Sequence, residues 1–195
     1  MQLVIESATA ACSAALLGAD GALIDERHEL VGRGHAERLL PMIADLLGAK
    51  GSRRRPSAIL VDCGPGSFTG VRVGLSAAHG LATGTRQPIA AASGEAQVAV
   101  ALLGGHGELF VQTYGGDPLS PLDNLRSLSP DEAAAEIASE LVIGSGSEAL
   151  VAARGRGRWS QAMPRAADAR LLPLSARSLE ARPIYGRAPD AKPMA

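Results

Sequence analysis

Residues 58–75 read AILVDCGPGSFTGVRVGL, and this stretch decides the fold of the chain. Its first part, Ala58 to Cys63, is a short apolar run of the kind that forms a buried strand. The glycine-rich run Gly64–Gly70 follows, and we predict a helix from Phe68 to about Thr83. A strand that leads through glycines into a helix is typical of an α/β fold.

The composition is that of a globular protein. Apolar residues make up 46% and charged residues 20% of the 195 residues, a length that suits one compact unit or two small lobes. The 19 Lys and Arg residues are balanced by 20 Asp and Glu residues, so a net charge of -1 offers no global basic field for a phosphate backbone. Cys12 and Cys63 lie in apolar runs, where cysteine packs as a small hydrophobe. The chain begins with the strand-like run Leu3–Ile5, and no apolar stretch reaches the roughly 20 residues needed to cross a bilayer, so we expect a cytoplasmic protein.

Strands and helices alternate along the chain, which implies mixed sheets covered by helices. In the first half we predict strands over Leu3–Glu6, Cys12–Leu17, Ala22–Leu30, Ala58–Cys63 and Pro88–Ala91, and helices over His35–Leu47, 68–83 and 93–103. In the second half we predict strands over Glu108–Tyr114 and Leu141–Ile143. A helix should begin with the capping box Ser129–Glu132, a short helix should follow Gly144–Ser147, and a last helix should cover 171–181. Between the last two we predict a loop over Arg154–Ala169.

The glycine-rich run leaves two interpretations open. Backbone N–H groups at a helix start attract anions, and glycines let a phosphate approach closely, so Gly66 and Ser67 are candidate anion ligands. The alternative is a tight turn that lets the helix lie close to the sheet. The run is not a Walker motif, because Val71-Arg72 follows where Lys-Ser or Lys-Thr is needed. A second, weaker loop of this kind contains Gly144 and Ser145.

Small residues form a ridge on the predicted helix after the glycines. Gly70, Gly74, Ala78 and Ala82 recur every four residues, which lets another element come unusually close. One hypothesis packs this ridge on the chain's own sheet or on the helix around Leu39. The other presents part of it to a second chain, because exposed apolar helix surface is costly unless a partner covers it.

Few residues suggest catalysis. No pair of histidines has the spacing that two metal ligands on one helix face need, and no Cys-x-x-Cys occurs. Glu6 and Asp62 end strands that could be neighbours; we interpret them as turn or capping groups, the alternative being carboxylates that hold Mg²⁺ through water. The basic run Arg53–Arg55 is interpreted as a solvated turn, with direct RNA contact as the weaker hypothesis. The sequence therefore predicts neither a catalytic residue nor a metal site.

Three stretches resemble the bacterial TsaB family, also called YeaZ: Ile5–Thr9, Gly34–Pro41 and Gly64–Leu75. The end of the chain, Pro183–Ala191, resembles that family's C-terminus. The resemblance implies an α/β ASKHA fold, related to actin and Hsp70, with two ribonuclease-H-like lobes of mixed sheets flanked by helices: residues 1–97 and a smaller, trimmed lobe over residues 98–195. Glu6-Ser7-Ala8 departs from the Asp-Thr-Ser usual in the family, which weakens any phosphate role of this turn.

The resemblance also implies a function, the making of threonylcarbamoyladenosine beside the anticodon of tRNA. The chain would be a non-catalytic partner of the transferase TsaD, joined by the ATPase TsaE, and it would also associate with a second copy of itself. tRNA would be reached only through the complex, and ATP or ADP would bind at the complex interface and not to the chain alone. The alternative is an independent phosphotransferase or peptidase-like enzyme of the same fold.

The resemblance places the partner surface on the first two helices. The expected interface residues are His35, Arg38, Leu39, Ile43, Phe68, Val71, Arg72, Gly74, Leu75 and Ala78. The candidate anion- or nucleotide-binding residues are Glu6, Ser7, Gly66, Ser67, Gly144 and Ser145.

Overall fold

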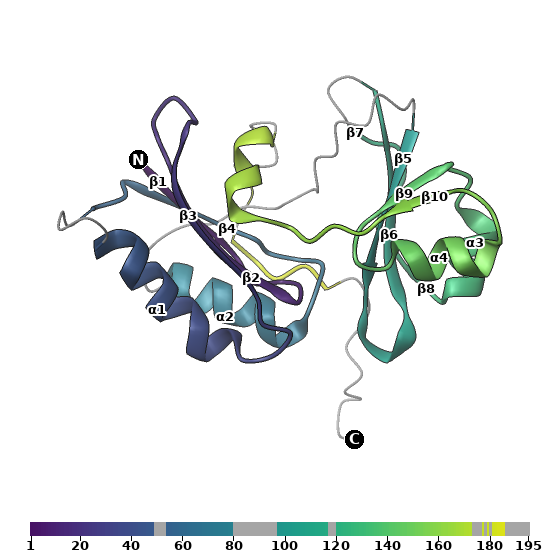
Figure 1. The fold of residues 1–195 in the computed structure, drawn as a ribbon, viewed down its shortest axis with the longest axis horizontal. Coiled ribbons are helices and arrows are strands. Elements are labelled where there is room, and N and C mark those ends of the chain that lie inside the picture. Colours follow the sequence, from purple (N-terminus) through teal and green to yellow (C-terminus); the bar gives the residue numbers. More distant parts are fainter. Residues whose placement is uncertain are drawn as a thin grey trace. The chain divides into compact units, whose positions relative to one another are not determined.

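The computed structural model describes residues 1–48, 54–79, 97–116 and 120–172, together with 177, 179 and 181–185. The chain divides into two compact units (Figure 1). The first unit comprises Met1–Ala92 and Ala162–Ile184, and the second comprises Ser93–Gln161 and Tyr185–Ala195. The boundary drawn at residue 97 from the sequence would put residues 162–172 in the second lobe, whereas these described residues belong to the first unit.

The first unit is a four-stranded mixed sheet with helices on both faces. Its elements are β1 (Gln2–Glu6), β2 (Ala11–Leu17), β3 (Leu23–Leu30), α1 (His35–Gly48), β4 (Ala58–Val61), α2 (Phe68–His79) and the 3-10 helix η3 (Ala166–Leu171). The strand order is β3-β2-β1-β4, with β1 antiparallel to β2 and parallel to β4. The structure confirms the three predicted N-terminal strands, the helix from His35 and the strand from Ala58. The predicted strand over 88–91 lies outside the described residues.

Helices α1 and α2 lie side by side on one face of this sheet (Figure 1). Leu3 and Ile5 of β1 point to that face and pack with Leu39 of α1 and Val71 of α2. Val4, one residue away, points to the other face. Because both faces of β1 are buried, its sequence is a continuous apolar run without alternation.

The opposite face is covered by η3 and the residue after it. Ala166, Ala167, Ala169 and Leu172 pack on Val4, Ala15, Leu17 and Leu60. The sequence predicts a loop over Arg154–Ala169, and this prediction is wrong for η3 and for Arg158–Ser160, which form a strand of the second unit. Three small alanines fill the layer, so the segment lacks the large apolar residues whose spacing would have indicated a buried element.

The second unit is a six-stranded sheet with helices on one face. Its elements are β5 (Gln97–Leu103), the 3-10 helix η2 (Gly105–Gly107), β6 (Leu109–Gly115), β7 (Ser120–Pro121), β8 (Arg126–Leu128), α3 (Pro130–Glu136), β9 (Leu141–Ile143), α4 (Ser147–Arg154) and β10 (Arg158–Ser160). The order is β10-β9-β5-β6-β7, with β8 also paired to β6. Residues from α3 and α4, including Ala133 and Leu150, pack on Ala99, Ala101 and Val142 of the sheet. The structure confirms the predicted strands β6 and β9, the helix α4, and the capping box of Ser129 and Glu132 that begins α3.

The predicted helix over 93–103 is wrong from Gln97 onward. Residues Gln97–Leu103 form β5, which is antiparallel to β6 and parallel to β9. Val98, Ala99, Val100 and Ala101 are all buried, as expected for a strand in the middle of a sheet. Alanine favours helices, but burial between two neighbouring strands outweighs that preference. Most of the predicted last helix over 171–181 lies outside the described residues.

Candidate functional site

The glycine-rich corner between β4 and α2 is filled by the turn that follows β1. We call residues 64–70 the first corner. The Ser67 N–H donates to the Ala8 carbonyl at 2.6 Å, and the Ser7 hydroxyl donates to the Gly70 carbonyl at 2.9 Å. A Cβ atom on Gly66 or Gly70 would collide with the carbonyl oxygens of Ala8 and Ser7, respectively. The glycines therefore let two backbone segments touch, which is the close helix–sheet packing that the sequence left as one of two alternatives.

Several N–H groups of the first corner already have internal acceptors. The Gly64 N–H donates to Asp62 Oδ1 at 2.8 Å, and the Gly70 N–H donates to the Ser67 hydroxyl at 3.2 Å. The Val71 N–H donates to the Ser67 carbonyl at 2.9 Å. An anion would have to displace these bonds to reach these N–H groups, which are closed to it in this conformation.

A second corner, residues 144–147 between β9 and α4, is closed in the same way. The Gly144 N–H donates to the Ser160 carbonyl at 3.0 Å, and the Gly146 N–H donates to the Ala101 carbonyl at 2.9 Å. The Ser145 hydroxyl accepts from the Leu103 N–H at 3.0 Å. Its candidate residues Gly144 and Ser145 therefore join strands β10 and β5 to the start of α4.

Two carboxyl groups are buried beside the first corner. Glu6 and Asp62 are 0% and 6% exposed. Their strands are parallel neighbours in which Ile5 pairs with Val61, and the Asp62 N–H donates to the Ile5 carbonyl at 2.9 Å. The structure thus confirms that the strands ending in Glu6 and Asp62 are neighbours.

Glu6 holds the turn that follows it. Its Oε1 atom accepts from the N–H groups of Ala8 at 2.9 Å and Thr9 at 3.3 Å. Its Oε2 atom is buried and has no hydrogen-bond partner among the residues that the structure describes. Burial raises the pKa of Glu6 well above its usual value, the nearby Asp62 carboxylate raises it further, and the bonds from Ala8 and Thr9 lower it. Burial also raises the pKa of Asp62, to about 6, against a lowering by the Gly64 N–H.

The described residues contain no cluster of three or more His, Cys, Asp or Glu side chains that could hold a metal ion. Both cysteines are buried in the core of the first unit, as the sequence predicts. Burial raises the pKa of the Cys12 thiol to about 11, so this thiol is a packing group and not a nucleophile.

Most of the expected interface residues are buried in the first unit's own core. This set consists of His35, Leu39, Ile43, Val71, Gly74, Leu75 and Ala78. A Cβ on Gly74 would lie 2.5 Å from Ser7 Oγ, so the small-residue ridge faces the sheet as far as Ala78; Ala82 lies outside the described residues. His35 lies with Nε2 3.0 Å from the Ala11 carbonyl. These side chains position the two helices and are not available to another chain as they stand.

The outward faces of α1 and α2 carry the other expected interface residues and two that the sequence did not suggest. Phe68 is 56% exposed, and the Arg72 guanidinium lies 3.5 Å from the centroid of its ring. On α1, Leu40 is 57% exposed and Pro41 is exposed beside it. We call Leu40, Pro41, Phe68 and Arg72 the outer helix surface. The signal for Leu40 was present, because it lies next to the buried Leu39 and therefore turns away from the sheet.

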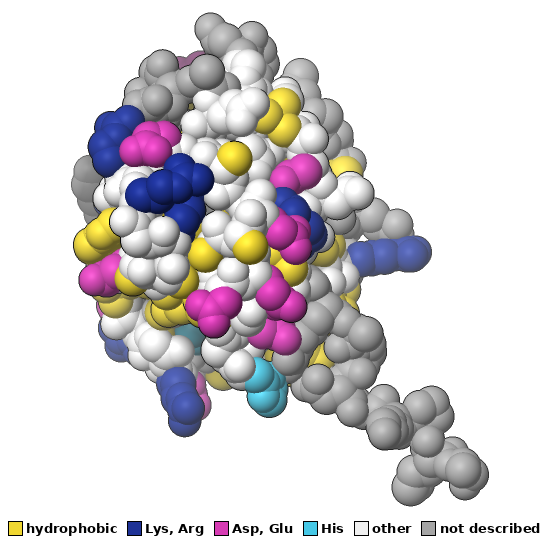
Figure 2. Space-filling model, turned by 90° about the vertical axis from the view of Figure 1, so that its right-hand side faces the viewer, with side chains coloured by type: hydrophobic (Ala, Val, Ile, Leu, Met, Phe, Trp, Pro, Cys, Tyr) yellow, Lys and Arg dark blue, Asp and Glu magenta, His cyan; other side chains and the backbone are white. Residues whose placement is uncertain are grey.

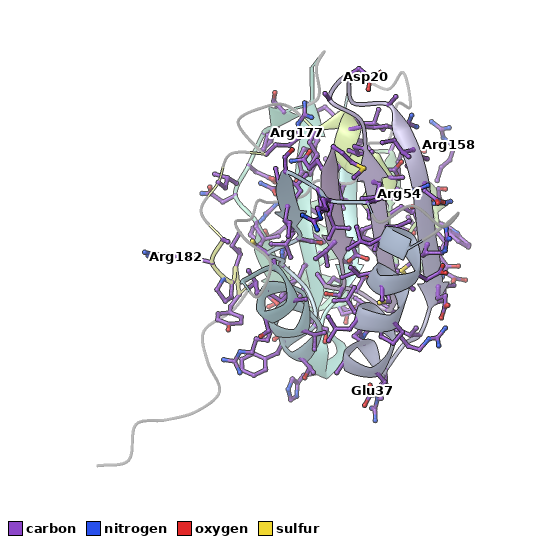
Figure 3. All side chains as sticks on the ribbon, turned by 90° about the vertical axis from the view of Figure 1, so that its left-hand side faces the viewer. Asp20, Glu37, Arg54, Arg158, Arg177 and Arg182 are labelled. Atoms are coloured by element: carbon purple, nitrogen blue, oxygen red, sulfur yellow. The ribbon has the colours of Figure 1, made fainter. Side chains whose placement is uncertain are left out.

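Arg38 and Arg54 serve the first unit itself. The Arg38 guanidinium pairs with Glu29 at 2.5 Å, and Arg54 pairs with Asp25 at 3.1 Å and donates to the Leu46 carbonyl. Arg54 and the exposed Glu37 mark opposite ends of α1 (Figure 3). Arg54 is thus part of an ion pair, while its neighbour Arg53 in the predicted basic turn lies outside the described residues.

The second unit shows no single-sign patch on the face drawn in Figure 2, where acidic and basic side chains of the described residues are interspersed. None of the helices in the described ranges combines the length and apolar content of a membrane-spanning segment.

Two α/β units, of which the first is a mixed sheet that begins with a β-hairpin and carries helices on both faces, define this chain as a protein of the ASKHA class. A protein-family model described as "TsaD: tRNA N6-adenosine threonylcarbamoyltransferase" matches residues 28–116. The solved structure of YeaZ from Pseudomonas aeruginosa matches with a TM-score of 0.75 and 27% identity, over 94% of this chain and 98% of that one. A second solved structure, described as an uncharacterized protein with similarity to peptidase YEAZ from Pseudomonas aeruginosa, has a TM-score of 0.77 at 27% identity and covers 95% and 99% of the two chains.

Two curated relatives carry the same tRNA threonylcarbamoyladenosine biosynthesis name, TsaB. The protein from Escherichia coli (strain K12) is 44% identical over 88 residues, which are 45% of this chain and 37% of that protein. The protein from Haemophilus influenzae is 42% identical over 90 residues, 45% of this chain and 36% of the relative. The chain thus matches little more than a third of the length of these relatives. Together with the structural matches, these relatives support the resemblance to TsaB and YeaZ that the sequence shows.

Proposed function

We propose that this chain acts in tRNA threonylcarbamoyladenosine biosynthesis as a non-catalytic partner of a TsaD-type transferase in the cytoplasm. Two TsaB relatives named for this biosynthesis support the process. The observation that carries the partnership is the outer helix surface, where two large apolar side chains, Leu40 and Phe68, are exposed on neighbouring helices. The TsaD family match spans residues 28–116 and so includes both helices.

The chemistry of this surface suits a protein partner. Exposed apolar residues on adjacent helices favour burial against another subunit. An aromatic ring with an arginine stacked on it, as in Phe68 and Arg72, is a combination common at the energetic centre of interfaces. The buried ridge of α2 fixes the helix against the sheet. The outer helix surface is therefore preorganised, and little conformational entropy is lost when a partner binds.

The proposal includes further assemblies, of which only self-association uses the same surface. A second copy of the chain would use it in competition with TsaD, and a TsaE-type ATPase would join the complex without needing it. tRNA would be bound through the complex. ATP or ADP would bind at the complex interface, since the N–H groups named above in both corners have internal acceptors.

Size-exclusion chromatography and calorimetry with purified TsaD test the partnership. We expect a one-to-one complex with the wild-type chain and its loss in Leu40→Glu and Phe68→Glu, because each buries a charge in the interface. Leu122→Glu is the matched control: Leu122 is 53% exposed but lies in the second unit, so binding should persist. An unchanged complex with the double variant Leu40→Glu/Phe68→Glu would show that the outer helix surface is not the site.

Calorimetry of the isolated chain with Mg-ATP separates the proposal from an independent phosphotransferase. We expect no binding heat. Tight binding that disappears in Glu6→Ala would instead support an enzyme that works alone.

A further inference from the structure

A row of polar side chains crosses one face of the first sheet at the level of Glu6. Glu6 pairs with Ser13 across β1 and β2, and Ser13 pairs with His28 across β2 and β3. Asp62 follows Val61 on the other side of β1. Side chains alternate along a strand, and Val4, Ala15 and Leu60 face η3, so this row points to the same face.

The polar side chains of this row differ in how many of their hydrogen-bonding atoms have a partner. The Ser13 hydroxyl accepts from the Ala166 N–H at 3.1 Å and donates to Glu26 Oε1 at 3.4 Å. Asp62 Oδ1 accepts from the Gly64 N–H at 2.8 Å. Glu6 Oε1 accepts from Ala8 and Thr9, whereas the buried Oε2 accepts from none of the described residues.

Two ionised carboxylates cannot be accommodated cheaply in this position. Neighbouring parallel strands are about 4.8 Å apart, so side chains in adjacent positions on one face are close together. Burying one unpaired carboxylate is already costly, and a second like charge adds repulsion. Arg165, a basic side chain beside this face, is paired with Glu26.

We propose that Glu6 and Asp62 share one proton in the folded protein, held in a hydrogen bond between Glu6 Oε2 and the Asp62 carboxyl group. The pair then carries one negative charge, and the orphaned oxygen gains a partner. The proton is taken from solvent when the chain folds. This inference stands on the first unit alone and is independent of the proposed function.

The proton has a consequence for stability as a function of pH. Burial raises the pKa of Asp62 to about 6 and that of Glu6 well above its usual value. In the unfolded chain the two groups titrate at about 3.9 and 4.3. Above those values the folded state binds more protons than the unfolded state, so stability falls as the pH rises towards and through the folded pKa values. Loss of the proton would leave two buried carboxylates beside the Ser7–Thr9 turn, which contacts α2 through the Ser7–Gly70 hydrogen bond.

Other titratable groups face this region and must be separated from the pair. Glu26 and His28 lie on β3. Arg165 precedes η3 and Asp168 lies in it. Cys12, on the other face of β2, is near Glu6. Burial opposes ionisation of Glu26, but the Arg165 ion pair holds the pKa of Glu26 below its usual value. Its contribution therefore has the opposite sign: it is lost as the pH falls. Site-specific signals are needed to resolve the pair.

Carboxyl ¹³C NMR of the full-length chain from pH 4 to 9 tests the proposal directly. We expect the Glu6 and Asp62 side-chain carbons to move together in a titration displaced upward from the exposed acids. Two resonances that each titrate at the ordinary value of an exposed acid would overturn the shared proton.

Amide variants give a second, independent measurement. In Glu6→Gln or Asp62→Asn the amide supplies a permanent donor to the remaining carboxylate and replaces the proton. Urea unfolding at pH 5 and pH 8 is followed through NMR signals of Leu3 and Ile5 in β1. Between these pH values the folding equilibrium constant of the wild-type protein should fall about tenfold more than that of either variant, since one pKa unit corresponds to a factor of ten.

The control is Glu140→Gln, because Glu140 is exposed and lies in the second unit. It should retain the wild-type pH profile. Identical profiles in the wild type and both amide variants would overturn the proposal. If one amide variant fails to fold, the other variant still tests the shared proton, and so does the carboxyl NMR titration of the wild-type protein.

Discussion

The first and second corners share a sequence pattern but are built differently. Each follows a buried strand, contains two or more glycines and leads into a helix. In the first corner the space beside the glycines is filled by the turn over residues 7–9, which a buried carboxyl group holds in place. In the second corner it is filled by the backbone of β5, and the N–H groups donate to neutral carbonyls of β5 and β10.

The difference teaches how a phosphate-type loop should be judged. Glycines between a strand and a helix indicate that something comes close to the backbone, and that neighbour is either a ligand or another part of the chain. In both corners of this protein it is the chain itself. The first corner also buries two acids, so only its stability should depend on proton binding.

The largest expected effect in this comparison is that of Gly70→Ala. Its Cβ would meet the Ser7 carbonyl, a backbone atom that cannot rotate away, so α2 or the turn must shift. We expect the first unit to lose about 3 kcal/mol or more of unfolding free energy, measured by urea unfolding through NMR signals of β1. Gly48→Ala is the control, because no atom lies within 4 Å of its Cβ position. A loss below about 1 kcal/mol in Gly70→Ala would show that the first corner is not tightly packed.

Gly144→Ala tests the second corner. Gly144 has φ +123°, and its Cβ would meet the Ala101 carbonyl. Strain and collision together should cost about 2–3 kcal/mol, confined to the second unit and followed by the fluorescence of Trp159. Gly155→Ala separates the two causes, because Gly155 has φ +69° with nothing within 4 Å. Equal losses in the two variants would mean that backbone strain alone explains the effect.

Two serine variants compare the hydroxyl groups that secure the corners. Ser7 Oγ donates to the Gly70 carbonyl at 2.9 Å, and Ser147 Oγ donates to the Gly144 carbonyl at 2.7 Å. Both serines are buried, so Ser7→Ala and Ser147→Ala should each cost about 1–2 kcal/mol in their own unit. Unfolding is followed by β1 signals for the first variant and by Trp159 for the second. A neutral Ser7→Ala would indicate that water replaces the lost bond and that the turn is looser than the hydrogen bonds suggest.

The smallest effect is expected outside the corners. Arg38→Ala removes an exposed ion pair with Glu29, and water screens such pairs. The urea midpoint of the first unit should be unchanged within error, at low and at high salt. A clear, salt-sensitive drop in that midpoint would show that α1 depends on its surface charges as well as on its buried face.

The strands and α-helices of the first unit could be predicted because each one carries its own local signal, which η3 lacks. Apolar runs between turn residues mark β1 and β2, and the spacing of Leu39, Ile43 and Leu46 marks α1. The error at β5 has a physical cause. An alternation of valine and alanine fits either a helix or a central strand, and only pairing with β6 and β9, distant in sequence, decides between them.

The candidate site was predictable in part for a related reason. Strand ends suggested that Glu6 and Asp62 are neighbours, and four-residue spacing suggested a closely packed ridge at Gly70, Gly74 and Ala78. Spacing does not say which partner the ridge touches, because sheet and helix both accept small residues. The burial of the ridge follows from the Ser7–Gly70 contact, which joins residues far apart in the chain.

The return of residues 162–172 to the first sheet affects the order of events during synthesis. Val4, Ala15, Leu17 and Leu60 leave the ribosome early, but the segment that covers them emerges only after most of the second unit has been made. Until then this apolar face has no cover from its own chain. Translation speed and chaperone binding therefore affect the yield of native protein. A fragment that stops before residue 162 would expose an apolar surface that favours aggregation.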